Sequence, residues 1–156
     1  MSTIKINREV EHITVKDDDG EVMFDWAVKT DDKSLEQMLH LVGNAMDRAG
    51  EYSQKAAEAE TPEDIAELNE MTVRLFRRTI SAIIGPEGYQ DVLTYIGDGE
   101  PCDPANNIAN IGEVFASLCT WLYSRCTSKQ LREAGVYFEA ESRKARRAKK
   151  SGKKRK

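Results

Sequence analysis

Residues 61–97 predict a mainly α fold, and they read TPEDIAELNEMTVRLFRRTISAIIGPEGYQDVLTYIG. It opens with Thr61, a preferred helix N-cap, and Pro62, whose missing N–H costs nothing at the first helical position. Apolar residues then recur every three or four positions, as one face of an α-helix requires: Ile65, Leu68, Met71, Leu75, Phe76, Ile80 and Ile83. The sequence predicts that this helix ends at Gly85-Pro86. A shorter helix is predicted from 86 to 96, and its buried side is Tyr89, Val92, Leu93 and Ile96.

Helical periodicity also precedes this stretch. Ser34 and Gln37 are spaced as a capping box, and an apolar stripe follows them to Ala49. From residue 51 to residue 60 the apolar content fades to alanine. We interpret residues 51–60 as a solvated helix end or as a lever that joins two packed parts.

A further helix is predicted after Asp103-Pro104, which repeats the cap-plus-proline start. Its apolar stripe runs from Ile108 to Cys126. Three more large residues widen the stripe: Val114, Trp121 and Tyr123. We therefore expect this helix to be covered on more than one side.

The first thirty residues predict a β-hairpin. Apolar and polar residues alternate imperfectly on both sides of the sequence DDDG at 17–20, and an Asp-Gly step tolerates the positive φ angles of tight turns. The second strand is expected to present one apolar face: Val22, Phe24, Trp26 and Val28. Two strands alone are marginal in water, so we expect this face to dock on the helices or on another copy.

Together these elements predict a mainly α fold: a helical bundle with a small N-terminal β-hairpin and a disordered basic C-terminal tail. A chain of 156 residues, 40% of them hydrophobic, has the usual size of one domain. We assign residues 1–142 to that domain, with the hairpin in 1–30 and the helices in 31–142. Residues 143–156 form the tail.

The tail concentrates charge. It holds ten basic residues and no acid, whereas residues 1–142 hold thirteen basic and twenty-seven acidic residues, a net charge of −14. The basic residues are Arg143, Lys144, Arg146, Arg147, Lys149, Lys150, Lys153, Lys154, Arg155 and Lys156. Such a block stays solvated and attracts anionic partners. We favour an acidic protein surface, such as that of a neighbouring copy, over nucleic acid, because the tail lacks aromatic residues for base stacking and the acidic body repels a polyanion. A tail that only keeps the protein soluble is the third alternative.

No pattern of catalytic or ligand-binding residues accompanies the helices. The glycines match no dinucleotide or phosphate-binding motif, the acids of residues 98–103 lack EF-hand spacing, and the two histidines have no partner at zinc-ligand spacing. We predict a protein that is not an enzyme and uses no cofactor and no metal. No apolar run is long enough to cross a membrane and the N-terminus lacks a secretory signal, so we expect no membrane association and a cytoplasmic location.

The segment 77–97 supplies a resemblance. It reads RRTISAIIG at 77–85 and, after a short turn, GYQDVLTYIG at 88–97. This helix, glycine break and second helix resemble the tail assembly chaperones of long-tailed bacteriophages and of prophages in Gram-positive bacteria. The N-terminal β segment, the helical remainder and the Lys-rich end are similar as well.

The resemblance implies a non-enzymatic helper whose copies coat the apolar tape-measure protein until the tail-tube protein polymerises around it. It implies these two proteins as partners, a homo-oligomer and the host cytoplasm. We expect the partner-binding residues to be Val22, Phe24, Trp26, Ile80, Ile83, Tyr89, Leu93 and Ile96. The alternatives are a nucleic-acid-associated protein that acts through the basic tail and a structural tail or connector component of the virion.

Overall fold

The computed structural model describes residues 9–135, and this part of the chain confirms a mainly α fold with an antiparallel two-stranded hairpin. Strands β1 (Val10–Lys16) and β2 (Val22–Lys29) form the hairpin. The helices are α1 (Asp32–Glu58), α2 (Pro62–Ile96), α3 (Ile108–Arg125) and the short α4 (Ser128–Glu133), and a 3-10 turn, Pro104–Asn106, precedes α3. The predicted disordered tail, 143–156, lies outside the described residues.

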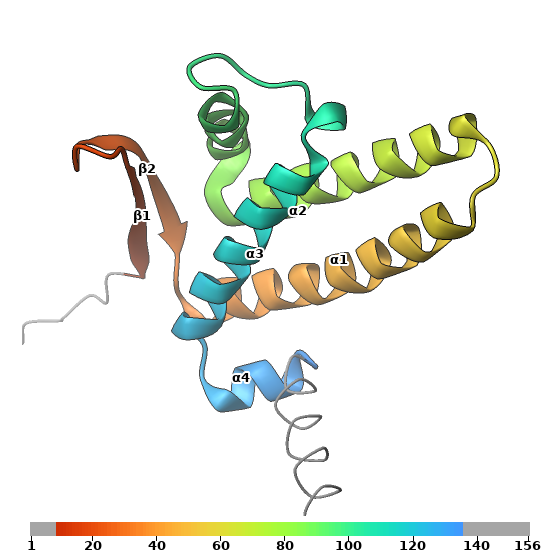
Figure 1. Cartoon of the computed structure of the whole chain (residues 1–156). Coiled ribbons are helices and arrows are strands. Elements are labelled where there is room, and N and C mark those ends of the chain that lie inside the picture. Colours follow the sequence, from red (N-terminus) through yellow and green to blue (C-terminus); the bar gives the residue numbers. More distant parts are fainter. Residues whose placement is uncertain (1–8, 136–156) are drawn as a thin grey trace, which may run out of the picture.

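Helices α1 and α2 run antiparallel, and α3 crosses one face of the pair (Figure 1). The hairpin lies at the end of the pair where α1 begins. Helix α4 lies against α1. The Gln130 Nε2 donates to the Asp32 Oδ1 at 3.2 Å, and a Cβ on Gly43 would stand 3.8 Å from the Ala134 carbonyl oxygen. The chain thus returns to α1 after α3.

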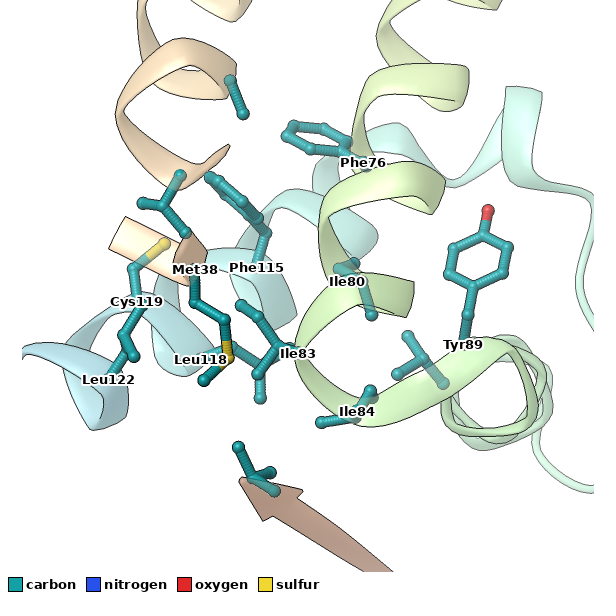
Figure 2. Packing of buried hydrophobic residues seen from close by; sticks show 14 of the residues in the cluster. Met38, Phe76, Ile80, Ile83, Ile84, Tyr89, Phe115, Leu118, Cys119 and Leu122 are labelled. Atoms are coloured by element: carbon teal, nitrogen blue, oxygen red, sulfur yellow. The ribbon is translucent and has the colours of Figure 1, made fainter. Parts of the chain in front are cut away.

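One hydrophobic core lies where the first half of α1, the later part of α2, and α3 meet (Figure 2). Its most completely buried side chains come from four elements: Val28, Leu39, Val42, Ile80, Val92, Ile111 and Leu122. Burying one such aliphatic side chain stabilises by about 1.5–3 kcal/mol. Because these contacts are shared among β2, α1, α2 and α3, the core fixes the hairpin and the helices relative to one another.

The far half of the α1–α2 pair, residues 46–75, contains no buried residue, and we call it the arm. Its apolar side chains are half-buried or exposed, and Ile65 is 40% exposed. The prediction of a solvated helix end at residues 51–60 is confirmed, because α1 continues to Glu58 without a buried side chain. At the turn, the Thr61 Oγ1 accepts a hydrogen bond from the Asp64 backbone N at 3.2 Å, as its predicted capping role requires.

Gly85 divides α2 in two, as predicted from the Gly85-Pro86 step. Its φ of 87° and ψ of 162° lie in a region that is essentially available to glycine alone. The segments pack closely across this kink, since a Cβ on Gly88 would stand 2.6 Å from the Ile84 Cγ1. The second segment of α2, residues 86–96, therefore turns toward the hairpin (Figure 1).

Two predicted helix starts are wrong by a few residues. Helix α1 is capped by Asp31, whose carboxylate accepts from the Ser34 backbone N at 3.1 Å, so the predicted Ser34–Gln37 capping box does not form. Aspartate is as good an N-cap as serine, and here it comes three residues earlier. Asp103-Pro104 starts the 3-10 turn, and α3 begins later, after Asn107.

The hairpin is confirmed, with an irregular register near its turn. Ile13 pairs with Trp26 and Val15 with Phe24, but the next pair is Lys16 with Val22, so Met23 is an extra residue in β2. A bulge of this kind breaks the alternation of side chains. Val22 is consequently 56% exposed and leaves the predicted apolar face, whereas Trp26 and Val28 are buried on it.

Candidate functional site

An apolar groove of about 660 Å³ lies between the hairpin, the second segment of α2 and α3. The hairpin contributes Ile13, Val15 and Trp26; α2 and the loop after it contribute Val92, Tyr95, Ile96 and Asp98; α3 contributes Asn110, Glu113, Val114, Ser117, Leu118 and Trp121. We call the surface that these residues line the groove. Three separate chain segments build it, and both tryptophans of the chain line it.

Trp26 fixes the hairpin wall of the groove. Its indole Nε1 donates to the Asp91 Oδ2 at 2.9 Å, which joins β2 to the second segment of α2. Its ring stacks on Phe24, with centroids 6.3 Å apart. A buried indole normally finds a partner for its N–H, and a carboxylate acceptor makes the bond stronger than a neutral one. The kink at Gly85 is therefore a condition for this wall, because it places Asp91 within reach of Trp26.

Arg125 lies against Trp121, one of the residues that line the groove. Its guanidinium Nε donates to the Glu11 carboxylate of β1, and its Cζ lies 5.2 Å from the centroid of the Trp121 ring. Both partners of the ion pair are 40% exposed, so the pair stabilises only weakly. The stacked cation instead covers one face of Trp121 and orients the ring.

The groove combines an apolar floor with an acidic rim. Asp98 and Glu113 line the end where the loop enters α3, and no basic residue lines the groove. The described residues carry twenty-five acids against eleven basic residues. Such a surface favours an apolar segment that is flanked by positive charge.

The predicted partner-binding residues divide between the groove and the interior. Trp26 and Ile96 line the groove. Phe24 is half-buried behind Trp26, and Val22 is exposed near the hairpin turn. The remaining four are buried in the protein's own core: Ile80, Ile83, Tyr89 and Leu93, at 0–5% exposure. These four have no surface to offer a partner in the folded chain, because α1 and α3 pack over the apolar stripe that had suggested them.

Sequence reasoning did not assign Ile13, Val15, Tyr95, Val114 or Trp121 to a partner surface, although all five line the groove. A signal for α3 was present, because Val114 and Trp121 widen its apolar stripe beyond what one core contact needs. The surface emerges only when the hairpin face and the second side of α3 come together in space.

The groove and its surroundings offer little reactive chemistry. Burial raises the pKa of the Cys119 thiol to about 12 and that of the Cys126 thiol to about 11, so both are protonated at neutral pH. His12 lies outside the groove, where its Nδ1 is 3.1 Å from an Asp25 carboxylate oxygen on an exposed part of the hairpin. Within residues 9–135 no three His, Cys, Asp or Glu side chains are grouped as metal ligands.

Comparison with protein-family models, with curated proteins and with solved structures gave no match. In the part of the chain that the structure describes, no helix has both the length and the apolar character needed to cross a bilayer.

Proposed function

We propose that this chain is a tail assembly chaperone of a long-tailed phage or prophage, which binds an apolar helical segment of the tape-measure protein. The observation that supports this role is the apolar groove, where large side chains stay accessible to a partner. Tyr95 is 49% exposed, and Val114 and Trp121 are only half-buried. Exposed apolar surface gathered in one concave place is typical of a protein-interaction site.

The dimensions of the groove suit a helix. From Asn110 to Trp121 its α3 wall spans about 16 Å at a rise of 1.5 Å per residue, the length of about three helical turns. An amphipathic helix that lies in such a groove presents anchors at i, i+3 or i+4 and i+7. A tape-measure segment with this spacing would place its apolar face against the two tryptophans.

The lining also favours binding over catalysis. It contains the carboxylates of Asp98 and Glu113, the hydroxyls of Tyr95 and Ser117, and no histidine, cysteine or lysine. Most of the remaining lining is aliphatic or aromatic. A chaperone needs only this apolar area and a charged rim that orients its client.

Co-expression with the tape-measure protein encoded in the same gene cluster tests the proposal. We expect the chain to keep the tape-measure protein soluble, and Ser117→Arg to abolish this effect by placing a long side chain in the groove. Ala116→Arg is the matched control, because Ala116 is exposed on the same helix but does not line the groove. Equal solubility of the tape-measure protein with Ser117→Arg and with the unmodified chain would contradict the proposal.

A further inference from the structure

The groove has a shape and a charge pattern that one segment of the chain itself complements. Residues 136–138 read Val-Tyr-Phe, the acids Glu139 and Glu141 follow, and the ten basic residues begin five positions after Phe138, at Arg143. The groove has the matching order. At its Trp121 end the Arg125 guanidinium covers one face of the aromatic ring, and its other end carries Asp98 and Glu113. We infer that the groove is an interface between copies of this chain and that residues 136–147 of a second copy occupy it.

The distance between the aromatic and the charged residues of the groove agrees with the distance between the aromatic and the basic residues of the segment. Trp121 and Glu113 are eight residues apart on α3, about 12 Å along the helix axis. Phe138 and Arg143 are five residues apart, which an extended chain spans with up to about 17 Å. Tyr137 and Phe138 can therefore lie over Trp121 while the first basic residues reach the acidic rim.

The reach of the chain requires a second copy. Ala134 lies against Gly43 of α1, and α1 packs on the side of α3 where the Tyr123 hydroxyl is 3.3 Å from the Met46 Sδ. The groove contains no residue of α1 or α4. Phe138 is three residues beyond Gly135 and reaches at most about 10 Å from it, which is less than the path around a helix 10–12 Å across. The apolar triplet of one chain therefore enters the groove of another.

Occupation by a neighbouring copy would cover the apolar groove before a client is present. Opposite charge draws the basic segment toward the acidic body, and the aromatic pair supplies apolar contact area. This interface needs no tape-measure protein, so it stands or falls separately from the proposed function. If the interface between copies and the proposed function are both correct, the client and the neighbouring copy compete for the groove.

Sedimentation velocity of the full chain tests the inference. We expect concentration-dependent self-association that weakens as salt is raised from about 50 to 500 mM, because screening shortens the range of the charge attraction. Ser117→Arg and the double variant Tyr137→Ser/Phe138→Ser should each weaken it at least tenfold. Ala116→Arg should not weaken it. Unchanged thermal unfolding of all three variants, at a concentration where the unmodified chain is monomeric, would show that the fold is intact.

Mixing the two defective variants is the decisive experiment. Ser117→Arg retains an intact segment, and Tyr137→Ser/Phe138→Ser retains an intact groove, so the mixture should form a heterodimer although neither variant associates alone. A full chain that stays monomeric at millimolar concentration would overturn the inference. So would self-association that survives both variants, or a mixture that does not complement.

Discussion

The two apolar faces of α3 differ in what covers them. One face, with Ile111, Phe115 and Leu122, is buried against α1 and α2. The other face, with Val114, Ser117 and Trp121, lines the groove and stays partly open to solvent. Both faces carry large apolar side chains, but only the first is closed by the chain's own helices. The first face stabilises the fold, and the second face is the one that we propose binds a partner.

Truncation of the buried face should have the largest effect on the fold. Leu122 is fully buried, and Leu122→Ala should lower the free energy of unfolding by about 3 kcal/mol, through lost apolar contact and the cavity that remains. Ser117→Arg, five residues away on the groove face, should change it by less than about 0.5 kcal/mol. Chemical denaturation measures both. Similar losses for the two variants would remove the distinction between the faces.

The kink at Gly85 positions one wall of the groove, and its loss should be the next largest effect. Gly85→Ala should cost about 1–3 kcal/mol, because its φ and ψ are unfavourable for any residue with a Cβ. Gly50→Ala is the control: Gly50 lies within α1 with open space around it, so alanine there should be neutral or stabilising. The expectation fails if both glycines tolerate alanine equally in thermal unfolding.

One side-chain hydrogen bond joins Trp26 of the hairpin wall to Asp91 of α2. Trp26→Phe replaces the indole by a smaller aromatic ring and removes the donor to Asp91, and we expect a loss of about 1–2 kcal/mol and faster amide hydrogen exchange in β2. Asp91→Asn keeps an acceptor oxygen and should lose less. Unchanged exchange in β2 after Trp26→Phe would show that apolar packing alone holds the hairpin.

Tyr89 should give the smallest effect. Its hydroxyl is buried without a hydrogen-bond partner among the described residues, and burial raises its pKa. Tyr89→Phe removes this unsatisfied group, so the unfolding free energy should stay the same or rise slightly. Client binding should not change, because Tyr89 belongs to the interior. Weaker binding by Tyr89→Phe would instead support the sequence-based expectation that Tyr89 contacts the partner.

The sequence was sufficient for the mainly helical fold and its hairpin. Thr61-Pro62 and Gly85-Pro86 marked the bounds of one helix because capping and proline geometry act locally. Ile80 and Leu93 are buried in the core, which the sequence did not indicate, because an apolar stripe does not tell whether the same chain or a partner covers it. Val22 was misplaced for a different reason, since the extra residue at Met23 in β2 has no clear sequence signal.

19F NMR of the chain labelled with 5-fluorotryptophan shows whether the proposed client binds in the groove. The chain has only two tryptophans, and both line the groove. On addition of an unlabelled tape-measure segment, we expect both signals to shift, Ala116→Arg to preserve the shifts and Ser117→Arg to abolish them. If sedimentation detects binding while neither signal moves, the client does not bind in the groove.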